Sequence, residues 1–237
     1  VTVKVTRSDG TTFNFDALMC EWTAESQRNV IDLTLASTGA VGAPPTWVLA
    51  NHDTTRVVTR YGRPITGIRF GRDGIDAESF AGIGTVPPGD TDVALGRKRA
   101  RAAVLLELGL PGGAYVYQGD ELGLEEVEDI PNDMRQDPMF FRTHGGNLGR
   151  DGCRVPIPWS GQEPPFGFSP PDAGREPWLP QPRAWGDRTV EAQTGDPDAM
   201  LELYRRALTC RRDQPALGDG GLRWLPAPPS VLAFSRD

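Results

Sequence analysis

Short strand-like runs alternate with amphipathic helical patterns in this chain, and this alternation restricts its fold more than any other sequence feature. Residues 12–19 alternate apolar and polar side chains, whereas residues 46–50 and 114–117 are short, continuous apolar runs. The first pattern is typical of a half-buried strand, and the other two are typical of parallel strands buried on both faces. Strands that alternate with helices indicate a parallel sheet with right-handed crossovers, and therefore an α/β fold.

Three helices are expected between and after these strands. The first is capped by Thr23 and runs to about Ser37, and the second is capped by Asp90 and runs through Leu108. A third helix, capped by Asp196, follows a long irregular segment near the end of the chain. Each helix has one apolar face, so each is expected to pack against the sheet or against a neighbouring helix.

Residues 118–195 interrupt this pattern and are too long and irregular to be an ordinary connection. Of the 22 prolines, 11 lie between Pro131 and Pro182, so no continuous helix can form there. The same segment is also rich in aromatic residues, namely Phe140, Phe141, Trp159, Phe166, Phe168, Trp178 and Trp185. Rings on a proline-stiffened loop suit the walls of a ligand cleft, and a loop that packs its own rings would account for them equally well.

The composition narrows the classes of partner. The chain has 25 Lys and Arg against 32 Asp and Glu, a net charge of −7, and so lacks the basic footprint of a nucleic-acid-binding protein. Its longest apolar stretch, residues 102–106, is far shorter than the ~20 residues of a membrane-spanning helix. Three widely spaced cysteines and two histidines fit neither a disulfide framework nor a zinc site, so we expect a reducing, cytoplasmic location and no metal centre.

Polar side chains directly follow the second predicted strand. Asn51, His52 and Asp53 come first, and Arg56 lies one turn later. In parallel α/β folds, catalytic groups gather beyond the carboxyl ends of the strands. A carboxylate with imidazole and amide neighbours can accept hydrogen bonds from vicinal sugar hydroxyls and stabilise positive charge on an anomeric carbon. Taken alone, the tripeptide is more typical of a helix N-cap aspartate beside a buried histidine than of a catalytic site.

Two further segments place polar groups at the same end of the sheet. Residues 118–123 follow the third predicted strand with two carboxylates, of which Glu121 is expected to anchor the loop rather than act as an acid. Residues 149–159 then bring Arg150 and Arg154 close in sequence to an aromatic ring. Arginine and aromatic groups beside carboxylates make a polar wall on which a ligand can stack.

In this order and spacing, three strings are similar to the α-amylase superfamily, glycoside hydrolase family 13: WVLANHDTTRVVTRYG, PGGAYVYQGDELGL and GRDGCRVPIPW. More narrowly, they resemble its bacterial α-glucosidase and oligo-1,6-glucosidase branch, over nearly the whole chain from Phe13 to Asp237. The resemblance implies the C-terminal portion of a (β/α)8 TIM barrel in residues 1–215, about strands 6–8 with their helices and the long insertion. It also implies the start of an all-β, sandwich-type C-terminal domain in residues 216–237.

The resemblance assigns roles to residues that match the family motifs. Asp53 would be the catalytic aspartate that stabilises the transition state, with His52, Arg56 and Arg154 as substrate-binding neighbours. Three residues would support the loops around it: Asn51, Tyr117 and Glu121. No metal or other cofactor is implied for these positions.

The two carboxylates that break the glycosidic bond are expected outside this chain. By the resemblance, the nucleophilic aspartate and the acid/base glutamate of a retaining enzyme both fall before Val1. Glu21 and Glu25 do not replace them, because acidic residues are favoured at a helix start for dipole reasons alone. We therefore expect a fragment of an α-glucosidase for α-linked gluco-oligosaccharides, inactive without the missing N-terminal barrel half.

Two other classes of function are open. A compact carbohydrate-binding module without catalysis would keep the aromatic segment and bind sugar without hydrolysing it. A different α/β enzyme, such as an esterase, would need a G-x-S-x-G nucleophile elbow, which the sequence lacks, as it lacks a phosphate-binding loop. The acidic loop of Asp73, Asp76 and Glu78 suits a solvated turn better than a calcium site, although calcium is not excluded.

Overall fold

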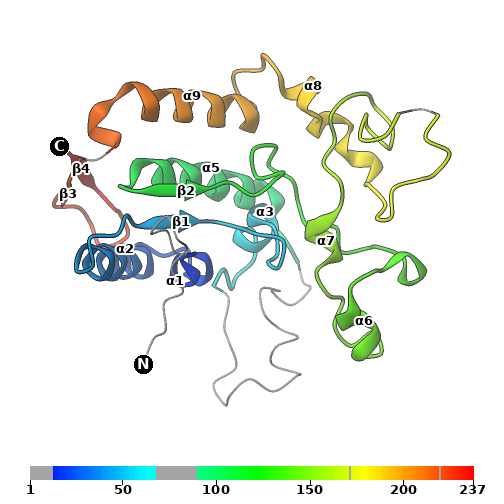
Figure 1. Cartoon of the computed structure of the whole chain (residues 1–237), viewed down its shortest axis with the longest axis horizontal. Coiled ribbons are helices and arrows are strands. Elements are labelled where there is room, and N and C mark those ends of the chain that lie inside the picture. The colour runs from blue at the N-terminus through cyan, green and yellow to red at the C-terminus, as the bar shows by residue number, and fades with distance from the viewer. Residues whose placement is uncertain (1–12, 68–89, 171, 219) are drawn as a thin grey trace.

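Two parallel strands lie at the centre of the computed structural model, which describes residues 13–67, 90–170, 172–218 and 220–237. Strand β1 (Thr46–Val48) pairs with β2 (Gly113–Tyr115), and Trp47 lies opposite Ala114. In Figure 1 the pair lies between α2 (Ala24–Gly39) on one side and α9 (Met200–Asp213) on the other. This parallel pairing confirms the predicted second and third strands.

The first predicted strand, residues 12–19, is wrong over the part that the structure describes. Residues Phe15–Met19 form a short helix, α1, because Asn14 caps it. The Oδ1 atom of Asn14 accepts the N–H of Ala17 at 3.0 Å, while its Nδ2 donates to Thr34 Oγ1 and to the carbonyl of Thr46, both at 3.0 Å. A capping side chain that also binds two distant segments outweighs a local alternation of apolar residues.

The first two predicted helices are confirmed, with one change of cap. Helix α2 follows Thr23, whose hydroxyl accepts the N–H of Ser26, as the sequence predicts. Helix α5 (Val93–Gly109) follows Asp92, whose carboxylate accepts the N–H of Leu95 at 2.9 Å. The predicted cap, Asp90, therefore lies two residues too early.

The third predicted helix forms as α9 but begins later than expected. Its N-cap residue is Ala199, which has no side chain able to cap. The predicted cap, Asp196, instead accepts the N–H of Asp198 in the turn before the helix. Residues Pro215–Leu217 then form the 3₁₀ helix η3, after α9 has ended at Asp213.

Helix α3 (Val57–Tyr61) packs closely against α5 and forms the main hydrophobic core with it and with α9. Gly96 permits this approach, because a Cβ atom at that position would collide with the backbone carbonyl of Val58. The fully or nearly buried members of this core come from all three helices and from the end of β1: Ala50, Val57, Val58, Tyr61, Ala100, Ala103, Val104, Leu108, Met200 and Tyr204. This core holds the carboxyl ends of both strands in place.

Residues 118–195 lie beyond the carboxyl ends of β1 and β2, on the right of Figure 1. The described residues of this segment form only short helices: η1 (Asn132–Met134), α6 (Pro138–Arg142), α7 (Asp151–Arg154), η2 (Arg183–Arg188) and α8 (Val190–Gln193). A second core fills this segment and includes Phe166 and Trp185, each under 5% exposed, whereas Trp178 and Phe168 remain exposed. Phe166 and Trp185 therefore fit a segment that packs its own rings, whereas this core does not account for Trp178 and Phe168.

The chain ends in an antiparallel hairpin of β3 (Leu222–Trp224) and β4 (Phe234–Arg236). It packs near α2, where the indole N–H of Trp224 donates to Asp32 at 2.7 Å. Within the described residues, no helix combines the length and the apolar character needed to cross a membrane.

Candidate functional site

The carboxylate of Asp53, in the loop after β1, is bound by two arginines from the insertion. Arg150 Nη1 and Arg154 Nη2 each donate a hydrogen bond of 2.8 Å to Asp53 Oδ1. The Nε2 atom of His52 lies 3.4 Å from the other oxygen, Oδ2. Because the Asp53 side chain is 34% exposed, this carboxylate faces solvent as well as the arginines. The structure thus brings Asp53, His52 and Arg154 together, and adds Arg150 to them.

The loop that carries Asp53 is fixed by its own side chains. The amide oxygen of Asn51 accepts the N–H of Asp53 at 2.8 Å, which is an Asx turn. The hydroxyl of Thr54 accepts the N–H of Asn51 at 3.0 Å. Asn51 therefore fixes the backbone conformation of the loop at Asp53.

The short helix α7 presents both arginines to Asp53. Arg150 and Arg154 are four residues apart, so their side chains lie on one face of this helical turn. Arg154 also donates its Nε to the carbonyl of His52 at 2.8 Å, which joins α7 to the loop after β1. The four-residue spacing is a sequence signal that could have assigned Arg150 a role beside Arg154.

Asp137 is the buried partner of Arg150, and sequence analysis missed it. Its carboxylate accepts the Nε of Arg150 at 2.6 Å, the backbone N–H of Arg150 at 2.8 Å, and the N–H of Met139 at 2.9 Å. Burial alone would raise the pKa of Asp137, but these hydrogen bonds outweigh it and lower the pKa to about 2. Arg150 therefore bridges a buried carboxylate and the half-exposed carboxylate of Asp53.

Arg56 does not reach the exposed side of the site, which corrects its expected contact with substrate. Its side chain is fully buried, and its Nη1 and Nη2 donate to the carbonyls of Gln118 and Cys153, both at 2.9 Å. Its backbone N–H donates to Glu126 at 2.9 Å. These contacts all lie inside the protein. Arg56 therefore connects the loops after β1 and β2 with α7 and supports the loop that carries Asp53.

Tyr117 and Glu121 also act as supports. The hydroxyl of Tyr117 donates to the carbonyl of Cys153 at 2.9 Å, and burial raises the pKa of this phenol to about 12. The carboxylate of Glu121 accepts the N–H of Gly119 at 2.7 Å and closes the turn after β2. Gly119 has φ +95, a conformation that favours glycine, and a Cβ there would meet the guanidinium of Arg56.

Two more carboxyl groups lie beneath the site. Burial raises the pKa of Asp120 to about 7, although the charge of Arg56 opposes the rise. Burial likewise raises the pKa of Glu126 to about 7, against the hydrogen bond that its carboxylate accepts from Arg56. Both groups can therefore gain or lose a proton near neutral pH.

Within the described ranges, no group of three or more histidine, cysteine, aspartate or glutamate side chains is arranged to hold a metal ion. The acidic loop of Asp73, Asp76 and Glu78 lies outside the described residues. The arrangement around Asp53 is instead that of an oriented carboxylate with hydrogen-bond donors beside it, which suits a polyhydroxylated, uncharged ligand.

The fold is similar to that of solved carbohydrate-active enzymes. The crystal structure of the α-glucosyl transfer enzyme XgtA matches 94% of this chain with a TM-score of 0.68 and 29% identity. Trehalulose synthase MutB from Pseudomonas mesoacidophila MX-45 matches 91% with a TM-score of 0.63 and 23% identity, which supports the fold alone. These matches cover 35% and 36% of the two enzymes, which are TIM-barrel proteins of glycoside hydrolase family 13, so the chain corresponds to a part of such a barrel.

Curated relatives agree with this comparison. A probable α-glucosidase of Rhizobium meliloti is 33% identical over 190 residues, and a glucan 1,6-α-glucosidase of Streptococcus dysgalactiae is 30% identical over 156 residues. The aligned parts are 80% and 59% of this chain but 28% of each relative, so the chain spans little more than a quarter of their length. The family model for the α-amylase catalytic domain matches residues 88–220, more than half of the chain. The chain therefore belongs to the α-amylase family, glycoside hydrolase family 13, and its relatives are glycoside hydrolases.

Proposed function

We propose that this chain is the C-terminal part of the catalytic domain of a retaining α-glucosidase, which releases terminal α-linked glucose from oligosaccharides. The observation that carries the proposal is the Asp53 carboxylate, held at the end of β1 with both arginines on Oδ1 and with Oδ2 turned toward His52. Relatives named α-glucosidase and glucan 1,6-α-glucosidase support the substrate class.

In this proposal Asp53 binds sugar hydroxyls and stabilises the charge that develops during cleavage. Its Oδ2 atom accepts hydrogen bonds from hydroxyl groups of the ring, and its negative charge faces the positive charge on the anomeric carbon. His52, whose side chain is 68% exposed, donates a hydrogen bond to the same ring. Because Arg150 and Arg154 already fix the carboxylate, little reorganisation is needed as the transition state forms.

The bond-breaking carboxylates belong, in this proposal, to a part of the protein that precedes this chain. Retaining glycosidases place a nucleophile and an acid/base carboxyl group about 5–5.5 Å apart. We assign residues 1–215 to the C-terminal part of the barrel, with β1 and β2 as two of its last strands, and residues 216–237 to the start of a β-sandwich domain. The parallel pairing of β1 with β2 and the antiparallel hairpin of β3 and β4 support this division.

The test is turnover of an aryl α-glucoside by the full-length protein. The Asp53→Asn substitution is expected to lower kcat/KM by about 10²-fold or more, because it removes the charge from an oriented transition-state group. Asp213→Asn makes the same chemical change at an exposed carboxylate at the end of α9 and is expected to leave kcat/KM unchanged. Equal activity of Asp53→Asn and the wild type would refute the assignment.

The 237-residue chain alone is expected to show no turnover above buffer. The two parallel strands that the structure describes cannot close a barrel, and the unpaired strand edges and the apolar surface beside them would favour aggregation. Circular dichroism and light scattering would detect this, and a monomer that melts cooperatively would contradict it. Saturable sugar binding by the full-length protein without any hydrolysis would favour the other candidate, a non-catalytic carbohydrate-binding module.

The cysteines support a cytoplasmic location. Cys20 and Cys153 are buried and Cys210 is exposed, and all three are free thiols, as is usual in a reducing compartment. Cell fractionation with an antibody against the full-length protein would test the location, and recovery outside the cytoplasmic fraction would contradict it.

A further inference from the structure

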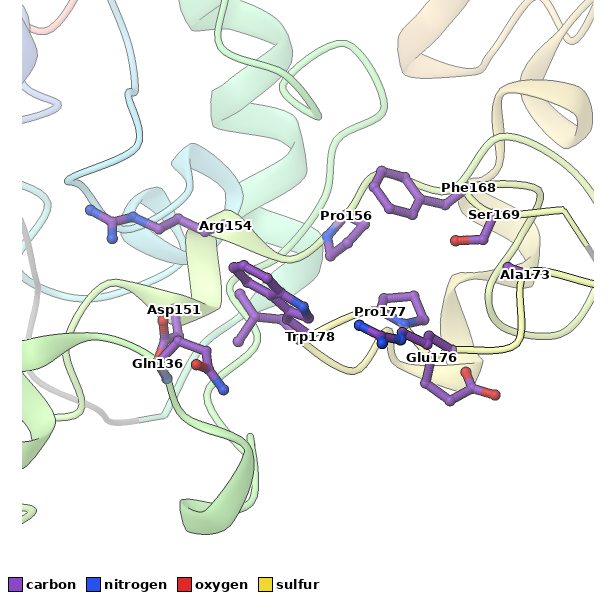
Figure 2. A pocket seen from close by; sticks show the side chains of 12 residues that line it. Gln136, Asp151, Arg154, Pro156, Phe168, Ser169, Ala173, Glu176, Pro177 and Trp178 are labelled. Carbon is purple, nitrogen blue, oxygen red and sulfur yellow. The ribbon is translucent and has the colours of Figure 1, made fainter.

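A cleft in the insertion has a volume of about 660 Å³, which lies within the size range of small-molecule sites. The cleft is lined by Gln136, by Asp151 and Arg154 of α7, by Pro156, and by residues from 168–169 and 173–179 (Figure 2). Nothing in the proposed mechanism uses this cleft.

The cleft keeps two aromatic rings exposed. Trp178 is 82% exposed and Phe168 is 48% exposed, whereas Phe166 and Trp185 of the same insertion are buried in its core. Pro156 and Pro177 stand beside these rings and restrict the backbone on both walls. A large indole left in solvent beside a stiff cleft offers a flat apolar face for a ligand.

Polar groups surround the rings. The side chains of Arg175, Glu176 and Gln136 line the cleft, and Figure 2 shows the carboxylate of Glu176 beyond the ring of Pro177. Within the described residues, no hydrogen bond or ion pair engages the side chain of Arg175 or Glu176. Guanidinium, carboxylate and amide groups at the edge of an aromatic platform can donate to and accept from hydroxyl groups.

Helix α7 connects the cleft to the candidate active site. The side chain of Arg154 lines the cleft, and its guanidinium points away from Trp178 toward the loop after β1, where it binds Asp53. Asp151 lines the same wall, is 1% exposed, and accepts the N–H groups of Gln136 and Asp137 at 2.7 and 3.0 Å. Helix α7 is therefore a rigid element that belongs both to the wall of the cleft and to the site of Asp53.

We propose that this cleft binds an α-linked gluco-oligosaccharide of two or three units, with one ring stacked on Trp178 and its hydroxyls on Glu176, Arg175 and Gln136. A pyranose ring has apolar C–H groups on its faces and hydroxyls around its edge, which matches an aromatic platform with polar groups at its margin. The identity of the sugar rests on the proposed function. Binding here retains a longer oligosaccharide beside α7 while Asp53 acts on a terminal unit.

The test measures the binding of maltotriose and of isomaltotriose to the full-length protein by calorimetry, in an Asp53→Asn background that slows turnover. Trp178→Ala is expected to weaken the binding of at least one sugar about tenfold, equivalent to roughly 1.4 kcal/mol. Trp178→Phe is expected to retain most of the affinity. Trp159→Ala changes another exposed tryptophan of the insertion, 48% exposed and outside the cleft lining, and is expected to leave affinity unchanged.

Several outcomes would overturn the proposal. Equal affinities of Trp178→Ala and Trp159→Ala would do so, as would the absence of saccharide binding. Acrylamide quenching compared between the wild type and Trp178→Ala reports whether Trp178 is accessible, and a shielded indole would mean that another segment of the protein fills the cleft. A failure of the proposed function has a different signature, namely aryl α-glucoside turnover that does not depend on Asp53.

Discussion

The helical part of the chain and the insertion both have hydrophobic cores, but they are held in place by different interactions. In α2, α3, α5 and α9, regular helices with apolar faces pack against β1 and β2. In the insertion, polar side chains bind backbone groups across the segment: Arg135 donates to the carbonyls of Glu128 and Leu148, and Gln193 donates to that of Leu122. Regular periodicity forms the long helices of the first region, whereas the insertion has only short helices in its described residues and relies on side-chain hydrogen bonds to its backbone.

The candidate active site lies where these regions meet. Asp53 comes from the loop after β1, and Arg150 and Arg154 come from the insertion. A site divided in this way depends on the stability of both regions, so a change that loosens either one should disturb Asp53. Variants in each region separate the two contributions.

The largest expected effect is a dependence of the free energy of unfolding on pH. The sign of this dependence differs between Asp120 and Asp137. The pKa of Asp120 is raised from 3.8 to about 7, so the folded protein keeps a proton that the unfolded chain has released. Its contribution to the free energy of unfolding is therefore present below about pH 4 and is lost as pH rises to about 7, a change on the order of 4 kcal/mol. Asp120→Asn should reduce this dependence in urea unfolding curves measured from pH 4 to 8, with the contribution of Glu126 remaining, and an unchanged slope would contradict the prediction.

Asp137 has the opposite dependence on pH. Its pKa is lowered from 3.8 to about 2, so its contribution is present above about pH 4 and is lost as pH falls toward 2. Asp137→Ala also leaves two backbone N–H groups and Arg150 without their buried acceptor, and should lower the free energy of unfolding by about 3 kcal/mol. Asp133→Ala, at an exposed position of η1, is the matched control and should change it by less than about 0.5 kcal/mol. Similar unfolding midpoints for the two variants would contradict the role of Asp137.

The sequence predicted the helical region better than the insertion for a physical reason. The caps and apolar faces of helices are local, so α2 and its cap Thr23 were predicted correctly. The strand at residues 12–19 was wrong because Asn14 binds Thr34 and Thr46, which are 20 and 32 residues away. No local pattern contains such contacts.

The difference between local patterns and contacts of distant residues also explains which residues of the candidate site the sequence predicted. Asp53 was found because catalytic groups follow the ends of parallel strands. Asp137 was missed because it lies 13 residues before Arg150, and only the folded insertion brings the two together. Arg56 was expected to face a ligand, but its guanidinium binds carbonyls 62 and 97 residues away and is buried.

A glycine pair tests how closely the helical region is packed. Gly96→Ala places a methyl group against the carbonyl of Val58 and should separate α3 from α5, lowering the free energy of unfolding by about 2 kcal/mol. Gly39→Ala, at the end of α2, meets nothing within 4 Å and should be neutral or stabilise by about 0.5 kcal/mol. The two variants would be compared by urea unfolding, and equal stability would show that the α3–α5 contact tolerates expansion.

The smallest effect compares one capping residue in each region. Thr23 caps α2 at an exposed position, where its hydroxyl accepts the N–H of Ser26. Thr189 caps α8 in the insertion, where its hydroxyl is 1% exposed, accepts the N–H of Ala192 and donates to the carbonyl of Gly186. Thr23→Ala should cost about 0.5–1 kcal/mol, and Thr189→Ala should cost up to about 2 kcal/mol, because it leaves the buried carbonyl of Gly186 as well as the N–H of Ala192 without this partner. Equal costs would mean that the insertion relies on local caps as much as the helical region does, and the contrast between the two regions would then fail.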